Sequence, residues 1–381
     1  MAVTNGTTIT PVRYRPDVED IHPDEPEIAR ELAKTMLSVS EKTYADTGHA
    51  IRSVHAKSHG LIGASVEVLD DLPPELAQGI FAEPTRYEAV IRLSTTPGDI
   101  LHDSVSTPRG MALKILHVEG ERLPGSEDSH SQDFVMVNGK EFNSPSGKAF
   151  LKNLKLLAAT TDRLEGTKEV LSKVFKTVEK GLEAIGRESA ALKSMGGNPE
   201  THILGTSFFS QLPIRYGDHV AKLSVAPASP NLKALTDTTV DTKDPDALRH
   251  AVQTFFEEET AVWELKVQLC ADLEEMPVES VEAWDEEKSP FITVARITAQ
   301  PQTAWSDERS ETVDDGMHFS PWNGVTSHQP LGSLMRLRKL AYHRSAAFRS
   351  QRNETPVTEP MTCPFGHGMG ATSVRSQTAQ L

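Results

Sequence analysis

The segment Tyr87–Ser94 constrains the fold of this chain more than any other stretch. Its residues alternate in kind, with Tyr87, Ala89, Ile91 and Leu93 at odd positions and Val90, Arg92 and Ser94 at even positions. Successive side chains of a β-strand point to opposite faces of the sheet. We therefore predict a strand whose apolar face lies in the core and whose other face directs Arg92 and Ser94 into a pocket.

Similar strand patterns lie on both sides of a helical section. The further predicted strands are Arg109–Leu116, Asp133–Val137, Gln211–Val225, Val262–Leu269 and Ile292–Ile297. After the second of these, apolar residues recur at helical spacing within an insertion at about 147–200, which begins after a typical N-cap residue, Ser146, and ends at Gly196 and Gly197. This pattern predicts an α+β fold, in which helices surround an antiparallel β-barrel or sandwich.

One domain, residues 26–350, contains all of these elements. Residues 1–25 are rich in Thr, Pro and Asp and predict an extended N-terminal arm. The first helix of the domain begins at Pro26, where apolar residues start to recur every four positions, and the last helix covers residues 331–348 and is strongly basic. Residues 351–381 are polar and predict a flexible C-terminal tail.

The composition limits the classes of function. The chain of 381 residues, 38% of them hydrophobic, is long enough to bury a large core. Its formal net charge of −15 and lack of a long basic run argue against a nucleic-acid partner. The two cysteines, Cys270 and Cys363, form no metal-binding spacing and suit a reducing compartment. With no signal-like or membrane-spanning apolar run, we expect a cytoplasmic protein without a membrane partner.

Three polar residues on or beside predicted strands could carry chemistry: His55, Ser94 and Asn138. Histidine is the usual acid and base near neutral pH, and asparagine can hold a polar substrate without taking its proton. A lone histidine is more often a structural residue than a catalytic one. These three residues alone therefore specify no reaction.

Near the end of the chain, Arg338 lies one helical turn before Tyr342 and on the same face of the last predicted helix. A cation at this position favours the phenolate form of the tyrosine. A phenolate is a hard anionic ligand for ferric iron, and tyrosine is a known axial ligand of haem. The pair therefore predicts a candidate iron ligand, although a partly buried tyrosine on an amphipathic helix gives the same pattern.

Five motifs, taken together and in this order, resemble the haem catalase family. They are Arg52-x-Val54-His55-Ala56-Lys57, Val90-x-Arg92-Leu93-Ser94-Thr95, Arg109-Gly110-Met111-Ala112-x-Lys114, Asp133-Phe134-Val135-x-Val137-Asn138 and Arg338-x-x-Ala341-Tyr342. The resemblance extends over most of the chain, and the order of the motifs makes it specific. It implies a catalase-like antiparallel β-barrel with surrounding helices.

The resemblance also implies roles for individual residues. His55 corresponds to the distal histidine, Ser94 to the serine that hydrogen-bonds its imidazole, and Asn138 to the substrate-orienting asparagine. Tyr342 corresponds to the axial tyrosinate of haem b, with Arg338 as its partner. The other implied cofactor-binding residues are Val54 before the histidine, Arg52, Arg92 and Arg349 on the haem propionates, and Phe150 stacked on the porphyrin.

These implied roles agree with physical chemistry. Haem b is a large apolar disc with two carboxylates, and guanidinium groups bind carboxylates well. His55 would transfer a proton from one peroxide oxygen to the other. One departure concerns the fourth motif, where this chain has Val137-Asn138 and the family usually has two asparagines.

The chain is shorter than typical catalases, and we expect it to lack their flavodoxin-like C-terminal domain. It therefore resembles a small group of catalase-related bacterial haem proteins. This resemblance implies a cytoplasmic haem peroxidase of the oxidative stress response, which takes a small-molecule peroxide and an electron donor and forms a homo-oligomer, a dimer or a tetramer. It also leaves room for catalase activity on hydrogen peroxide or for turnover of organic peroxides.

Two alternatives remain open at the level of the sequence. One is a fatty-acid hydroperoxide isomerase or lyase similar to allene oxide synthase. In such relatives the residue before the distal histidine resembles threonine, whereas this chain has Val54. The other alternative is a haem-binding protein without catalytic activity.

Overall fold

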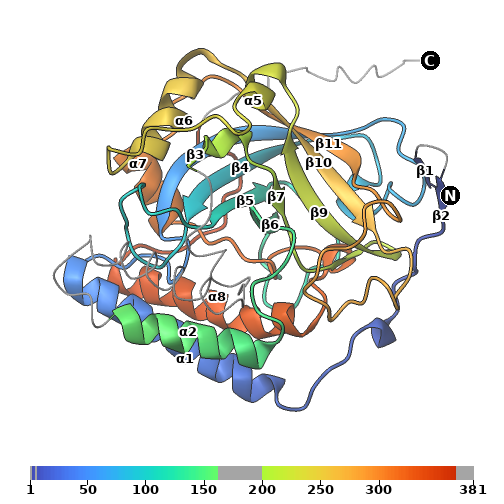
Figure 1. The fold of residues 1–381 in the computed structure, drawn as a ribbon, viewed down its shortest axis with the longest axis horizontal. Coiled ribbons are helices and arrows are strands. Elements are labelled where there is room, and N and C mark those ends of the chain that lie inside the picture. Colours follow the sequence, from blue (N-terminus) through green and yellow to red (C-terminus); the bar gives the residue numbers. More distant parts are fainter. Residues whose placement is uncertain (1, 5–6, 162–199, 366–381) are drawn as a thin grey trace, which may run out of the picture.

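The computed structural model describes residues 2–4, 7–161 and 200–365, and a β-barrel lies at its centre (Figure 1). The later part of the predicted helical insertion, including Gly196 and Gly197, falls outside the described residues. Within the described part of the chain, no helix is long and apolar enough to cross a membrane.

The barrel is built from antiparallel strands. Those of the main sheet are β3 (Lys57–Val68), β4 (Arg86–Thr95), β5 (Arg109–Ile115), β6 (Gln132–Val137), β7 (Phe208–Phe209), β8 (Ile214–Tyr216), β9 (His219–Pro227), β10 (Ala261–Leu269) and β11 (Ile292–Ala299). They follow the order β10-β11-β3-β4-β5-β6-β7-β9-β8, and β10 also pairs with β9. Eight strands therefore form a closed ring, and β8 pairs with β9 beside it.

Strand β4 has the two faces that its sequence predicts. Ala89, Ile91 and Leu93 are fully buried in the main apolar core of the barrel. Arg92 and Ser94 are buried on the opposite, outer face, where β4 meets other parts of the chain. The polar residues of this strand thus lie at the boundary between the barrel and the elements that cover it.

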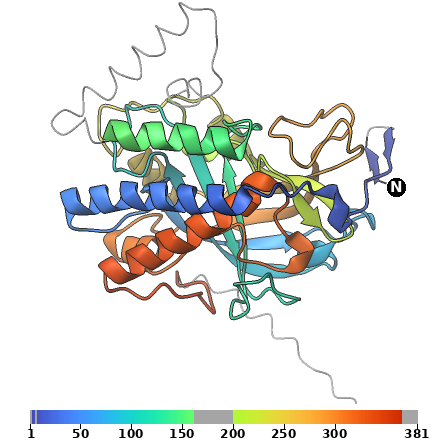
Figure 2. The ribbon, with the colours of Figure 1, turned by 90° about the horizontal axis from the view of Figure 1, so that it is seen from below.

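Three long helices cover one side of the barrel. They are α1 (Glu25–Thr47), α2 (Gly147–Thr161) and α8 (Ser333–Arg352). They form one layer in which α1 lies between α2 and α8 (Figure 2). Leu32 of α1, Leu154 of α2 and Ala341 of α8 share one buried apolar cluster, which joins the layer together.

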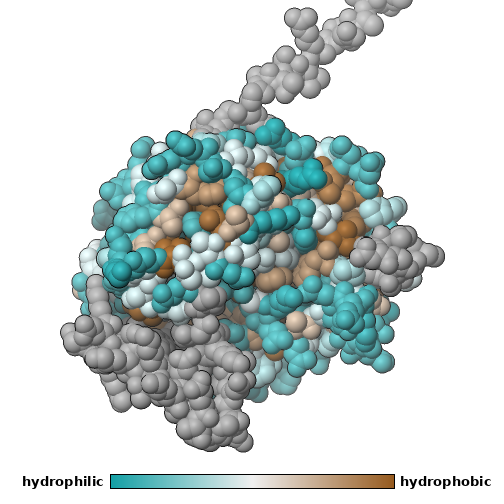
Figure 3. All heavy atoms as spheres, turned by 45° about the horizontal axis from the view of Figure 1, so that its top comes forward, coloured by the Kyte–Doolittle hydropathy of each residue, from teal (hydrophilic) through white to brown (hydrophobic). Residues whose placement is uncertain are grey.

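Shorter elements complete the described structure. They are the hairpin strands β1 (Ala2–Thr4) and β2 (Thr7–Ile9), the helices α5 (Pro230–Ala234), α6 (Ala247–Glu258) and α7 (Asp307–Ser310), the 3-10 turns η1 (Pro16–Val18), η2 (Gly79–Phe81), η3 (Ile203–Gly205) and η5 (Thr326–His328), and the π-helical turn η4 (Glu311–Asp315). One face of the molecule is largely hydrophilic, with smaller apolar areas between the polar residues (Figure 3).

The predicted α+β class and barrel are confirmed, whereas some boundaries differ. The single strand predicted over 211–225 is a hairpin, because the chain turns at Gly217, with φ of 59°, between β8 and β9. Ser146 caps α2 as predicted, since its hydroxyl accepts a hydrogen bond from the N–H of Ala149 at 3.3 Å. Residues 353–365, predicted as part of a flexible tail, lie against the barrel wall through several hydrogen bonds.

Candidate functional site

His55 lies in the turn that connects α1 to β3. Its φ of 52° is in the left-handed region, which non-glycine residues adopt uncommonly and which often marks a functional site. This backbone turns the imidazole toward strands β4 and β5, where Nδ1 lies 3.3 Å from Oγ of Ser94. The structure therefore brings together His55 and Ser94, which the sequence predicts as partners.

Gly110 of β5 provides the space for this imidazole. In the barrel register Gly110 lies opposite Ser94. A Cβ atom at Gly110 would lie 2.7 Å from Nδ1 of His55, a distance at which one of the two must shift, and 3.1 Å from Oγ of Ser94, which is also tight. The sequence analysis includes Gly110 in a motif but assigns it no role, because only the pairing of β4 with β5 reveals the close approach.

The surroundings keep His55 neutral. Burial lowers the pKa of its imidazole to about 3, and the cations Arg92 and Arg338 add to this effect. A neutral imidazole retains a lone pair and can accept a proton at neutral pH. Nη2 of Arg92 on β4 donates to the Ala56 oxygen at 3.0 Å, and Val54 contacts the cluster that contains Ala341 of α8, so the barrel wall and α8 both lie close to His55.

The predicted pair on α8 forms a direct hydrogen bond. Nη2 of Arg338 donates to the phenol oxygen of Tyr342 at 2.5 Å. The Arg338 guanidinium carbon also lies 5.2 Å from the centroid of the Tyr342 ring. Tyr342 is half-buried, so its phenol combines a fixed cationic partner with a partly protected position.

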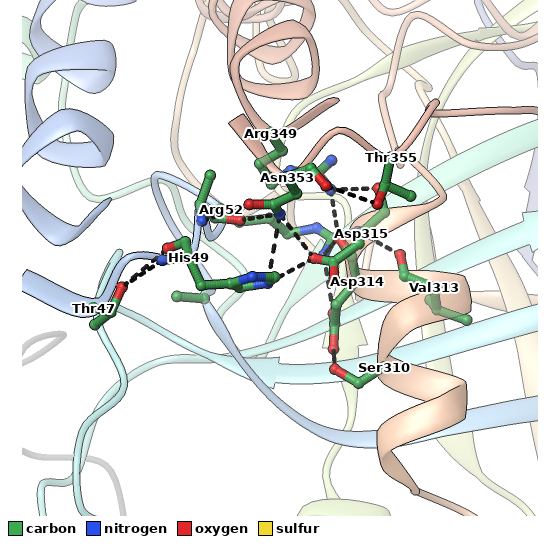
Figure 4. A network of polar contacts seen from close by, with 12 residues as sticks. Thr47, His49, Arg52, Ser310, Val313, Asp314, Asp315, Arg349, Asn353 and Thr355 are labelled. Carbon is green, nitrogen blue, oxygen red and sulfur yellow. Dashed lines mark hydrogen bonds and ion pairs between the residues drawn. The ribbon is translucent and has the colours of Figure 1, made fainter. Parts of the chain in front are cut away.

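The three arginines that the sequence assigns to the propionates meet at Asp314 of the π-helical turn η4. Figure 4 shows two of them, Arg52 and Arg349, beside Asp314. Oδ1 of Asp314 lies 2.9 Å from Nη1 of Arg52 and 2.6 Å from Nε of Arg92. Arg349 of α8 donates to the backbone oxygen of Asp314. We call these three arginines the arginine cluster.

Backbone carbonyls of the same turn also bind the cluster. Nη2 of Arg52 donates to the oxygens of Val313 at 2.9 Å and Met317 at 3.1 Å, and Nη2 of Arg349 donates to the Met317 oxygen at 3.2 Å. The carbonyl end of a helix carries a partial negative charge, which suits cations. Nε of Arg349 is buried and has no hydrogen-bond partner among the residues that the structure describes, so it can still donate to an anionic group.

Charge distinguishes Asp314 from an ordinary surface aspartate. Burial alone would raise the pKa of its carboxyl, but Arg92 and Arg52 lower the pKa below its usual range, so Asp314 is ionised. The three guanidinium groups face two carboxylates of the same turn, Asp314 and Asp315, so cations are in excess at the site. The sequence analysis missed Asp314, because an aspartate in an acidic chain carries no signal of its long-range partners.

The other predicted site residues lie around this region. Asn138 follows β6, and its Oδ1 accepts a hydrogen bond at 2.9 Å from the N–H of Arg109, the residue before Gly110. Val54 contacts the apolar cluster of the helix layer. Phe150 of α2 contacts both that cluster and the barrel core, and its ring lies edge-on to Phe142 with centroids 5.2 Å apart.

Comparisons with known proteins identify the fold. No family model matches the chain, and no curated protein matches its sequence. The structure resembles a fungal catalase, at a TM-score of 0.53 and 14% identity, over 88% of this chain and 68% of that one. It also resembles a bacterial catalase, at a TM-score of 0.54 and 13% identity, over 90% of this chain and 65% of that one.

A third solved structure gives the same result. Catalase A from Saccharomyces cerevisiae matches at a TM-score of 0.52 and 15% identity, over 95% of this chain and 71% of that one. The chain therefore has a catalase-like fold, and it spans about two thirds of the length of these catalases. At such low identity the likeness is one of fold.

Proposed function

We propose that this protein is a haem-dependent peroxidase that decomposes peroxides, with haem b held between the barrel wall and α8. The observation that supports this proposal most strongly is the arrangement around His55. Arg92 of the arginine cluster donates to the Ala56 oxygen beside His55 at 3.0 Å, and Val54 contacts the apolar cluster that contains Ala341, next to Tyr342, so the three groups adjoin one region. Their common setting is a fold shared with catalases.

The residues present fit a haem group. The arginine cluster brings three guanidinium groups together, and guanidinium groups bind carboxylates such as the two propionates well. The buried Nε of Arg349 offers an unused donor for one of those carboxylates. Tyr342 would hold the iron through its phenol oxygen, and Arg338 would donate a hydrogen bond to that oxygen.

The protein side chains then have distinct tasks. A bound haem supplies the electrons that break the oxygen–oxygen bond of the peroxide. In the tautomer whose Nδ1 proton is donated to Ser94, Nε2 of His55 has a lone pair and would take the proton of one peroxide oxygen. His55 then returns this proton to the departing oxygen, which leaves as water or an alcohol, and Asn138 orients the peroxide.

The proposal is tested by peroxide turnover in haem-loaded protein. We expect consumption of hydrogen peroxide or an organic peroxide, with either oxygen release or oxidation of a phenolic donor. His55→Ala should abolish most of this turnover while haem remains bound. His343→Ala is the matched control, because His343 is exposed on α8 and should leave the rate unchanged.

Two other outcomes of the same assays would identify a different function. Rearrangement of a fatty-acid hydroperoxide without any electron donor would identify a hydroperoxide isomerase or lyase. Haem-loaded protein that turns over none of these substrates would identify a haem-binding protein without peroxidase activity. Equal rates for the wild type and His55→Ala would contradict the assignment of the proton-transfer residue.

A further inference from the structure

The segment that follows α8 crosses the outside of the barrel, and we call residues 353–365 the strap. Nδ2 of Asn353 donates to the Ala50 oxygen at 2.9 Å, close to the turn that carries His55. Further along, the N–H of Thr358 donates to the Gly316 oxygen at 2.9 Å, and the N–H of Cys363 donates to Oε2 of Glu88 on β4 at 2.9 Å. The strap thus runs from the helix layer to the barrel strands.

Glu359 fixes the strap in a buried polar pocket of the barrel wall. Four groups donate hydrogen bonds to its Oε2: Nζ of Lys114 at 2.8 Å, Oγ of Ser131 at 2.6 Å, Oγ of Ser129 at 3.3 Å and Nδ2 of Asn323 at 3.3 Å. Nδ1 of His318 lies 3.2 Å from the second oxygen. Lys114 is 0% exposed and pairs with two carboxylates, those of Asp133 and Glu359, each at 2.8 Å, so Glu359 is one of the two counter-charges of a buried cation.

The barrel wall is also shaped to receive the end of the strap. Gly63 of β3 faces it, and a Cβ atom there would lie 3.1 Å from Sγ of Cys363 and 3.3 Å from Cβ of Phe365. The Phe365 ring in turn stacks under Arg309, with 3.9 Å from the guanidinium carbon to the ring centroid. A larger residue at position 63 would push the strap away from the wall.

Residues 316–319 connect the pocket of Glu359 to the arginine cluster. The Gly316 oxygen accepts from the strap, and the Met317 oxygen accepts from both Arg52 and Arg349. The Phe319 ring lies between the two charged groups, 5.5 Å from Nζ of Lys114 and 5.9 Å from the guanidinium carbon of Arg52. A shift of the strap would therefore move carbonyls that hold the arginines in place.

We propose that Glu359 is a positioning residue for the cofactor site, which locks the strap and so keeps the arginine cluster arranged to retain the two propionates. The proposal rests on the haem binding proposed above. Released from its pocket, the strap would no longer hold Gly316 and Met317, and haem would dissociate faster. In its docked position, the strap would therefore slow the loss of haem at the edge that carries the propionates.

The test uses the full chain, with and without haem. Glu359→Gln keeps the shape of the side chain and removes its charge, and Glu354→Gln is the matched control on the exposed side of the same segment. We expect Glu359→Gln to speed haem transfer to apomyoglobin by at least about tenfold, because a charge-assisted buried contact is lost. It should also speed amide hydrogen exchange at Thr358 and Cys363, whereas Glu354→Gln should change neither.

A second variant separates strap docking from the stability of the pocket. Gly63→Val should displace the strap without touching Glu359 or Lys114, and it too should speed haem transfer. Faster amide exchange with an unchanged transfer rate in either variant would overturn the retention role. Unchanged amide hydrogen exchange in Glu359→Gln would show that Glu359 does not hold the strap in place. A wild type that takes up no haem would overturn the proposed function instead. Amide hydrogen exchange would still show whether Glu359 holds the strap in place.

Discussion

Asp314→Asn is the substitution that most sharply tests how the arginine cluster is held. The Asp314 side chain is 16% exposed, and both of its carboxylate oxygens accept hydrogen bonds. Oδ1 accepts from Arg52 and Arg92, and Oδ2 accepts from Oγ of Ser58 at 2.7 Å and Oγ of Ser310 at 2.9 Å. Asparagine preserves the shape but removes the charge and turns an amide toward groups that donate.

The expected effect follows from the burial of these charges. Removing one partner of a buried ion pair lowers the free energy of unfolding by about 3–5 kcal/mol, because the other charge stays buried without compensation. The backbone carbonyls that Arg52 and Arg349 also contact should keep the loss near the lower limit. We therefore expect the haem-free variant to be about 3 kcal/mol less stable than the wild type.

Urea unfolding of the haem-free protein measures this difference. Glu311→Gln is the matched control, since Glu311 is exposed in the same turn. Because the folded-state pKa of Asp314 is depressed, its contribution is present above the unfolded value of about 3.9 and is lost as the pH falls below it. The difference from the wild type should therefore shrink below about pH 4. A loss no larger than that of Glu311→Gln would refute the reasoning.

Three further predictions concern the region around His55. Gly110→Ala should lower peroxide turnover about a hundredfold at unchanged haem content, because its Cβ displaces the imidazole, whereas Gly139→Ala, with ordinary contacts, should not. Turnover should be flat between about pH 5 and 8, since the His55 pKa of about 3 leaves the imidazole neutral throughout, and a step near pH 6.5 would count against this. Arg338→Met should alter the absorption spectrum of bound haem through Tyr342, and an identical spectrum would contradict the contact.

The fold was largely predictable because its signals are local. Alternation along β4 predicts both the strand and its buried face, and α1 and α8 follow from helical spacing near the two ends of the domain. The hairpin of β8 and β9 is not evident from the sequence, since apolar and polar residues alternate on both strands and the turn at Gly217 is short. The sequence predicts a flexible tail where the strap lies, because most of the strap residues are polar and their partners are distant in sequence.

The site was predictable only where an ordered set of motifs existed. His55, Ser94 and Tyr342 were proposed from that order, and the structure places the first two in contact. Asp314 and Glu359 could not be found in this way, because each acts through contacts with residues more than two hundred positions away in the chain. Their roles depend on how the barrel closes, which composition and local spacing do not encode.

Haem titration of the purified wild type and Tyr342→Phe, followed by absorption spectroscopy, tests the central claim most directly. The account predicts saturation at one haem per chain with the spectrum of a ferric tyrosinate complex, which Tyr342→Phe should weaken or abolish. Tyr44→Phe serves as the control, because Tyr44 packs on α1 against Phe348, with ring centroids 6.1 Å apart, and should change neither. No saturable binding, or an unchanged spectrum in Tyr342→Phe, would contradict the account.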